Sequence, residues 1–231
     1  MVFQVAIDGP VGSGKSTVAR LVAARSGFLF IDTGAMYRAV ALYLLKNVGH
    51  VAVRSEEAFN AVLKHINDNN HIIIDFKTTI GEQKVFLNGE DVTREIRSPK
   101  ATSGSSDMAA YPEVRKLVTD RARELAEGSR VVMEGRDIGT KVLPDAQLKV
   151  YLDAAVEVRA KRRHQELIEK GASVGYEKIL EDVKQRDYND MNRDADPLKK
   201  AEDAVGIDVG SMETEDVVDI IINLMKERGG L

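Results

Sequence analysis

The stretch that decides the fold is Val2-Phe3-Gln4-Val5-Ala6-Ile7-Asp8 followed by Gly9-Pro10-Val11-Gly12-Ser13-Gly14-Lys15-Ser16. The apolar run up to Ile7 is typical of a buried β-strand, and it meets a turn at Gly9 and Pro10. From Lys15 onward, apolar residues recur with helical spacing and stop before Gly27, which predicts a helix. The segment between strand and helix matches G-x-x-x-x-G-K-[S/T] in the structural context that this pattern requires.

This glycine-rich loop predicts a binding site for the phosphates of a nucleotide. Its glycines let backbone N–H groups converge on a phosphate, and the start of the following helix adds partial positive charge. Lys15 can reach the β- and γ-phosphates of a nucleoside triphosphate, and the Ser16 hydroxyl can bind Mg²⁺. The alternative is a glycine-rich turn that carries an exposed lysine.

The remaining pattern predicts an α/β fold with a five-stranded parallel sheet and helices on both of its faces. A second buried strand is expected at 28–31, and a helix follows it from Asp32 to Leu45. A helix from Pro112 precedes three more strands, expected at 131–134, 148–152 and 204–208. An apolar stripe from Val217 to Met225 marks the closing helix. Strands alternating with helices favour right-handed crossovers and parallel pairing.

Two segments interrupt this rhythm. Residues 55–96 predict an inserted subdomain with a short helix at 59–66 and an antiparallel meander, whose strands are expected at 72–76, 84–87 and 90–93. Asn88-Gly89 is a strong hairpin signal between the last two strands. Residues 156–192 predict two charged helices, 156–170 and 176–192, that form a mobile lid. The parallel core would then comprise 1–54, 97–155 and 193–231.

Composition excludes several classes of protein. The chain has 231 residues and a formal net charge of −4, so bulk electrostatic binding to nucleic acid or to an anionic membrane is not expected. It has no cysteine, and its four histidines lack the spacing of metal ligands. No apolar run approaches the roughly 18 residues of a membrane span, and the N-terminus carries no basic leader. We expect a cytoplasmic protein.

Two strand ends carry further candidates. Thr33 and Arg38 follow the second strand, and Glu134-Gly135-Arg136-Asp137 ends the third. The carboxyl ends of parallel strands face the ligand crevice in open α/β sheets. An acidic residue after the third strand is a candidate for organising Mg²⁺. The competing interpretations are a helix N-cap with a solvated Arg38, and a surface turn with an internal ion pair.

The charged helices present arginines at helical spacing. Arg159, Arg162 and Arg163 share one face, and a second face would carry Arg186, Asp190 and Arg193 if its helix continues. Each face alone is more typical of a solvated, salt-bridged helix. Ser106 and Arg115 carry almost no signal of their own. Together the arginines suit phosphoryl transfer, in which positioned cations neutralise spreading negative charge.

No residue stands out as a dedicated general base, and this bears on the acceptor. A hydroxyl acceptor benefits from a base that takes its proton. A phosphate monoester has a second pKa near ~6 and is already largely ionised at neutral pH. The sequence therefore favours a phosphate acceptor, although Asp32 or Asp137 could serve as a base.

In combination, these segments resemble the bacterial cytidylate kinase family over essentially the whole chain. The resemblance rests on the glycine-rich loop and on four further segments, which are Asp32-Thr33-Gly34-Ala35-Met36-Tyr37-Arg38, Ala109-Ala110-Tyr111-Pro112-Glu113-Val114-Arg115, Glu134-Gly135-Arg136-Asp137-Ile138-Gly139-Thr140 and Arg186-Asp187-x-x-Asp190-x-x-Arg193. The loop is shared by many nucleotide-binding families, whereas the other segments in this order are specific.

The resemblance implies a P-loop nucleoside monophosphate kinase fold and assigns roles to particular residues. By analogy, the cytosine would be read by Thr33, Ser106, Arg115 and Asp137, where Thr33 replaces the serine of some relatives and keeps the hydroxyl. The phosphate of CMP would meet Arg38, Arg136 and Arg193. Arg186 and Asp190 would lie near the ribose.

We therefore expect an ATP:CMP phosphotransferase that also accepts dCMP and uses Mg²⁺ bound at Ser16. Catalysis would depend on Lys15, Arg136 and Arg193. ATP would be held by Arg159 and by the loop residues Gly9, Pro10, Val11, Gly12, Ser13, Gly14, Lys15, Ser16 and Thr17. The partners would be small nucleotides and the protein a monomer. The alternatives are another small P-loop kinase, with a different nucleotide or a hydroxyl metabolite as acceptor, and a nucleotide-gated regulatory protein.

Overall fold

The computed structural model describes residues 2–48, 73–79, 82–169 and 171–231. The chain divides into two compact units, and each is considered by itself. The first comprises Met1–Leu29 and Gly128–Leu231, and the second comprises Phe30–Glu127. The expected helix at 59–66 lies outside the described residues.

A five-stranded parallel sheet forms the core, as the alternation of strands and helices predicts. Its order is β2-β6-β1-β7-β8, with bounds Leu29–Asp32, Val131–Gly135, Gln4–Asp8, Leu148–Asp153 and Val205–Asp208. β1 pairs in parallel with both β6 and β7, and Asp8 is in register with Gly135 and Tyr151. Ile7, Val132 and Leu152 are fully buried, because parallel strands are covered on both faces. The loops that follow β1, β6 and β7 therefore leave the same edge of the sheet.

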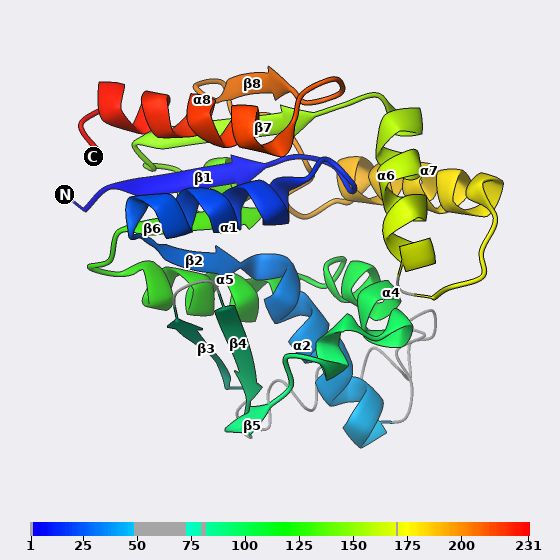
Figure 1. Ribbon diagram of the computed structural model, residues 1–231. Coiled ribbons are helices and arrows are strands. Elements are labelled where there is room, and N and C mark those ends of the chain that lie inside the picture. The colour runs from blue at the N-terminus through cyan, green and yellow to red at the C-terminus, as the bar shows by residue number, and fades with distance from the viewer. Residues whose placement is uncertain (1, 49–72, 80–81, 170) are drawn as a thin grey trace. The chain divides into compact units, whose positions relative to one another are not determined.

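Two helices of the first unit lie together over one face of the sheet. They are α1 (Lys15–Ser26) and α8 (Thr214–Glu227), which run side by side in Figure 1. α1 begins directly after the glycine-rich loop, with Gly14 as its N-cap in the left-handed conformation. Arg25 of α1 forms a salt bridge with Asp219 of α8 over 2.6 Å, and it also pairs with Glu215.

The charged segment predicted as two helices forms a helical hairpin. α6 (Val156–Glu169) and α7 (Tyr176–Asn192) pack together through Ala160, Ile179 and Val183, which are buried (Figure 1). A π-helical turn at Ile138–Val142 follows β6. The sequence pattern did not predict this turn.

In the described part of the second unit, three α-helices pack together beside an antiparallel meander. α2 (Thr33–Val48) packs against α4 (Pro99–Met108) and α5 (Pro112–Ala126). The meander order is β3-β4-β5, with bounds Ile74–Thr79, Glu82–Leu87 and Glu90–Asp91. Asn88 and Gly89 have the positive φ angles of a two-residue hairpin turn. β5 is shorter than expected, because the Val85 N–H bonds to the Thr93 side-chain hydroxyl instead of continuing the backbone ladder.

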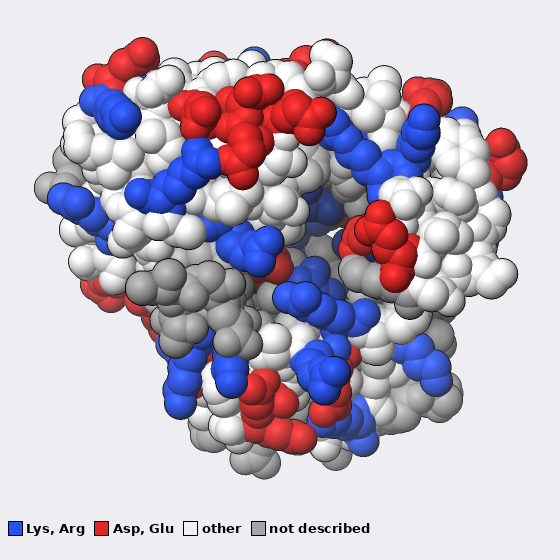
Figure 2. Space-filling view, viewed as in Figure 1, with Lys and Arg blue, Asp and Glu red and all other residues white. Residues whose placement is uncertain are grey.

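The surface carries both signs of charge. In the view of Figure 2, Lys and Arg side chains are interspersed with Asp and Glu, and acidic side chains gather over α8. Glu215 and Asp216 lie in the first turn of α8, where the helix dipole favours negative charge. No helix among the described residues is long and apolar enough to cross a membrane.

Candidate active site

The glycine-rich loop buries its lysine. Lys15 is only 5% exposed, and its Nζ donates to the Pro10 carbonyl over 2.8 Å. Burial lowers the pKa of Lys15 to about 7, helped by nearby Arg136 and opposed by Glu134 and Asp190. The interpretation of the motif as a surface turn with an exposed lysine is therefore wrong. The charged form of Lys15 is thus disfavoured by burial, and a phosphate beside it would favour that form again.

The loop rests on the helical hairpin. Gly12 has φ +77°, and a Cβ there would lie 2.9 Å from the Arg159 carbonyl oxygen, so the loop packs directly on α6. The Arg159 guanidinium donates to Val11 O over 3.0 Å, to Ala154 O over 2.8 Å and to Asp187 Oδ2 over 2.6 Å. Arg159 is thus engaged by protein groups here, and its contact with ATP stays a prediction.

The other two arginines of α6 have separate partners. Arg162 donates to the Val209 carbonyl over 2.6 Å, just after β8. Arg163 forms a salt bridge with Glu166 within the helix over 2.7 Å. The spacing of the three arginines predicts a shared face, but tertiary contacts send their guanidinium groups to three different places.

A hydroxyl and a carboxylate meet beside the loop. Ser16 Oγ donates to Glu134 Oε1 over 2.5 Å, and Glu134 is buried at the end of β6. Hydroxyl and carboxylate oxygens are the hard ligands that Mg²⁺ prefers, so this pair fits the metal. Among the described residues, no group of three or more His, Cys, Asp or Glu side chains could hold a metal ion. A Mg²⁺ ion at this pair would need phosphate oxygens and water to complete its shell.

Asp190 gathers the arginines of the candidate acceptor site. Arg136 Nε donates to Asp190 Oδ2 over 2.8 Å, and Arg193 Nη1 lies 3.8 Å from Asp190 Oδ1. Burial raises the pKa of Asp190, but Arg136, Arg186 and Arg193 outweigh it, and the net pKa lies below the ordinary value. One buried carboxylate thus interacts with three guanidinium groups.

Arg193 does not belong to the helix that its spacing suggests. α7 ends at Asn192, and Arg193 is its C-cap with extended backbone angles. The guanidinium donates to the Asp196 carbonyl over 2.9 and 2.6 Å and lies 3.8 Å from Asp137 Oδ1. Arg193 thus lies 3.8 Å from a carboxylate oxygen of both Asp137 and Asp190. Arg193 therefore joins Asp190 through tertiary contacts and not through a shared helix face.

Known proteins resemble this chain over nearly its whole length. The family model "Cytidylate kinase" matches residues 5–227. The chain belongs to the cytidylate kinase family. It is 46% identical to the cytidylate kinase of Geobacillus sp. (strain WCH70) over 99% of this chain and 98% of that protein. It is 43% identical to the Bacillus subtilis (strain 168) cytidylate kinase over 98% and 97%.

A solved structure with little sequence similarity supports the fold. It is an uncharacterized protein from Eubacterium ventriosum ATCC 27560, with a TM-score of 0.51 and 14% identity. The match covers 98% of this cytidylate kinase family chain and 99% of that one. At this identity the likeness concerns the fold alone.

The remaining candidates of this family member lie in the second unit. Thr33 begins α2 and is buried, and Arg38 forms a 2.8 Å salt bridge with Asp32. Asp32 Oδ1 also accepts the Ala35 N–H, so the predicted N-cap is confirmed, although Arg38 is paired rather than solvated. Ser106 lies on α4. Arg115 of α5 is only 2% exposed, and Nη1 approaches the Ala109 carbonyl at 3.5 Å.

Several contributors to the site escaped the sequence analysis. The helix α4 (Pro99–Met108) was not predicted because its sequence holds three serines, a threonine and a glycine, which are poor helix formers. The available signal was Ser98-Pro99, an N-cap followed by proline at N1. Asp187 appeared only as part of a motif, and Asp8 only as the end of a strand. Their importance depends on partners that are distant in sequence.

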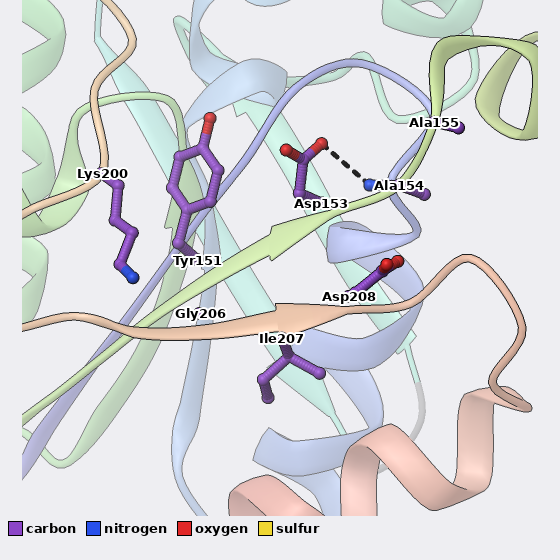
Figure 3. A pocket seen from close by; sticks show the side chains of 8 residues that line it. All are labelled: Tyr151, Asp153, Ala154, Ala155, Lys200, Gly206, Ile207 and Asp208. Carbon is purple, nitrogen blue, oxygen red and sulfur yellow. Dashed lines mark hydrogen bonds between the residues drawn. The ribbon is translucent and has the colours of Figure 1, made fainter.

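A shallow pocket opens elsewhere in the first unit, at the carboxyl ends of β7 and β8. Its volume is about 420 Å³, and it is lined by Tyr151, Asp153, Ala154, Ala155, Lys200, Gly206, Ile207 and Asp208 (Figure 3). Burial and nearby Asp153 raise the pKa of Tyr151 to about 12. None of the residues predicted from the sequence lines this pocket. Neither Lys15 nor Asp190 is among its lining residues.

Proposed function

We propose that the protein transfers the γ-phosphoryl group of ATP to CMP and to dCMP, giving ADP and the corresponding diphosphate. One observation carries this proposal: Lys15 and three arginines gathered by Asp190 interact electrostatically within one unit. Such a concentration of cations suits a reaction in which two anionic nucleotides must approach each other. Membership of the cytidylate kinase family supports the choice of CMP.

The donor side would consist of the glycine-rich loop, Lys15 and the Ser16–Glu134 pair. Loop N–H groups and the N-terminus of α1 would bind the β- and γ-phosphates, and Lys15 would exchange the Pro10 carbonyl for a phosphate oxygen. When bound, Mg²⁺ supplies charge neutralisation on those phosphates. Ser16 and Glu134 would hold it through oxygen atoms that already lie 2.5 Å apart.

The phosphate of CMP would bind to arginines. Arg136 and Arg193 present guanidinium groups beside Asp190 in the first unit, and we assign Arg38 of the second unit to the same phosphate. Arg186 and Asp190 are assigned to the ribose. The acceptor needs no general base, because a phosphate monoester is largely a dianion at neutral pH.

The base of the acceptor would be read by a buried carboxylate. Asp137 is 4% exposed, and it can accept a hydrogen bond from the exocyclic amine of cytosine. Uracil carries a carbonyl oxygen at that position and cannot donate. We assign Thr33, Ser106 and Arg115 to the same base, on the resemblance of their segments to the family.

We further propose that the core, the inserted subdomain and the lid predicted from the sequence have separate roles in this activity. The hairpin α6–α7 would act as the lid, and residues 55–96 as the subdomain that binds the monophosphate. We propose that the enzyme works as a cytoplasmic monomer on free nucleotides. Sedimentation of the purified protein with and without nucleotides tests the oligomeric state.

The deciding experiment measures ATP consumption with equal concentrations of CMP, dCMP, UMP, AMP, GMP and shikimate. We expect CMP and dCMP to give the highest kcat/KM values. Preference for another acceptor would replace the proposal with a different P-loop kinase activity. Slow hydrolysis that no acceptor stimulates would indicate a regulatory nucleotide-binding protein.

A further inference from the structure

Asp8 is a buried carboxylate that the proposed mechanism does not use. It ends β1, directly before the glycine-rich loop, and is 5% exposed. Oδ1 accepts the Ile138 N–H over 2.8 Å, and Oδ2 accepts the Gly139 N–H over 2.7 Å. Both oxygens are therefore acceptors for consecutive N–H groups on a segment 130 residues away. An ionised carboxylate is the group that satisfies two such donors.

The segment held by Asp8 begins immediately after Arg136 and Asp137. Ile138 and Gly139 open the π-helical turn, and the Asp137 carbonyl accepts the N–H groups of Lys141 and Val142 over 2.8 and 3.1 Å. The backbone at Asp137 has φ −143° and ψ 27°, which belongs to neither helix nor strand. The direction in which the Asp137 side chain leaves the sheet thus depends on how this turn is anchored.

The anchor has a second side. A Cβ on Gly139 would lie 3.1 Å from Lys149 Cδ and 3.4 Å from Asp8 Oδ2, so the backbone at Gly139 is held closely between them. Lys149 is itself fixed, because Nζ bonds to the Asp203 carboxylate over 2.8 and 2.9 Å. A segment clamped in this way has little freedom to reorient.

We propose that Asp8 is a positioning residue. By holding the turn that follows Arg136 and Asp137 against the start of the glycine-rich loop, it fixes the positions of these two side chains for binding the acceptor nucleotide. This inference rests on the proposed function, in which those two residues bind CMP. Asp8 itself touches no substrate in this scheme.

The test is Asp8→Asn, which keeps the size of the side chain and turns one acceptor oxygen into an NH₂ donor. That donor faces a backbone N–H, so one end of the clamp is lost. We expect KM for CMP to rise and kcat/KM for CMP to fall by roughly 10- to 100-fold, and the preference for CMP over UMP to shrink. KM for ATP is expected to stay within about twofold, because the loop amides are unchanged.

A matched control and a direct readout accompany the kinetics. Asp153→Asn changes the last residue of the neighbouring strand β7, whose carboxylate accepts only the N–H of the next residue, Ala154, among the contacts described for it. It should leave both KM values and the CMP:UMP ratio unchanged. Hydrogen exchange at the Ile138 and Gly139 amides should accelerate in Asp8→Asn and not in the control. If Asp8→Asn fails to fold, Gly139→Ala tests the same contact. This variant should also raise KM for CMP without changing KM for ATP, by a smaller factor.

The outcomes separate this inference from the proposed function. A loss of kcat with unchanged KM values and unchanged CMP:UMP ratio would reduce Asp8 to a purely structural residue. Unchanged exchange at Ile138 and Gly139 would also overturn the clamp. If the wild-type protein does not phosphorylate CMP at all, the proposed function fails, while the exchange data still report whether Asp8 anchors the turn.

Discussion

Arg159 and Asp187 form a buried ion pair that joins α6, α7 and the phosphate loop. The distance from Arg159 Nη1 to Asp187 Oδ2 is 2.6 Å, and the two side chains are 7% and 11% exposed. Arg159 also donates to Val11 O, whereas Asp187 Oδ1 is buried with no hydrogen-bond partner among the residues that the structure describes. The hairpin and the loop are therefore linked by one guanidinium group.

Removing the carboxylate from this pair should destabilise the protein strongly. Asp187→Ala leaves the Arg159 charge buried and unpaired, and we expect the free energy of unfolding to fall by about 3–5 kcal/mol in urea titrations. The control is Asp182→Ala on the same helix, which breaks the exposed pair with Lys178 and should have no measurable effect. Equal effects of the two variants would show that the buried pair has no special weight.

Lys15→Ala should abolish most of the activity without unfolding the protein. Lys15 supplies charge at the phosphates rather than packing, and burial already disfavours its charged form in the free protein. We expect kcat to fall by roughly 10²–10³-fold, and Tm not to fall. The matched variant is Lys161→Ala, an exposed lysine of α6, which should behave as wild type. Activity near the wild-type level in Lys15→Ala would exclude the loop as the site of transfer.

Arg186→Ala should damage the use of CMP more than that of ATP. Arg186 contributes to the positive surroundings of Asp190, which we assign to the acceptor. We expect KM for CMP to rise by roughly 10–100-fold, because a charge-assisted hydrogen bond is lost. Lys184→Ala, an exposed residue on the same helix, serves as the comparison. An effect confined to KM for ATP would move Arg186 to the donor site.

Stability should depend on pH through Asp8. Burial and the nearby Asp137 charge raise its pKa from 3.8 to about 6, against hydrogen bonds from Gly139 and Ile138 and the charge of Lys15. Between these two values the folded state binds more protons than the unfolded state, so stability is lost as pH rises through about 6. The difference in unfolding free energy between wild type and Asp8→Asn should therefore decline by roughly 3 kcal/mol from pH 3 to above pH 6. A difference that is constant across this range would contradict the raised pKa.

The sequence predicted most of the fold because its signals are local. The strand before Gly9, the helix from Lys15 and the Asn88-Gly89 turn each follow from a few consecutive residues, and the structure has them where they are expected. The failures occur where contacts between separate segments decide the structure. The helix α4 carries poor helix formers and is stabilised by packing on α2, and β5 ends early because the Thr93 side chain bonds to Val85.

The candidate site was only partly accessible from the sequence. The loop motif predicts Lys15 and Ser16, because phosphate binding imposes a fixed spacing on the loop, and Arg136 is predicted from its place at the end of a strand. The burial of Arg115 was not predictable, because the charged sequence around it in α5 is typical of a solvent-exposed helix. Arg193 lies just past the end of α7 and its guanidinium group is 3.8 Å from Asp137, which the helical spacing does not indicate.

By itself, the sequence determined the order of the parallel-sheet strands and of most helices along the chain, the position of the glycine-rich loop and the family, because short-range periodicity and consecutive motif residues encode them. Only the tertiary structure decided which charges meet. Glu134 reaches Ser16, Asp190 collects three arginines, and Asp8 holds Ile138 and Gly139 across 130 residues of chain. Such pairings arise when the parallel strands bring their carboxyl ends to one edge of the sheet, and no local rule of sequence specifies them.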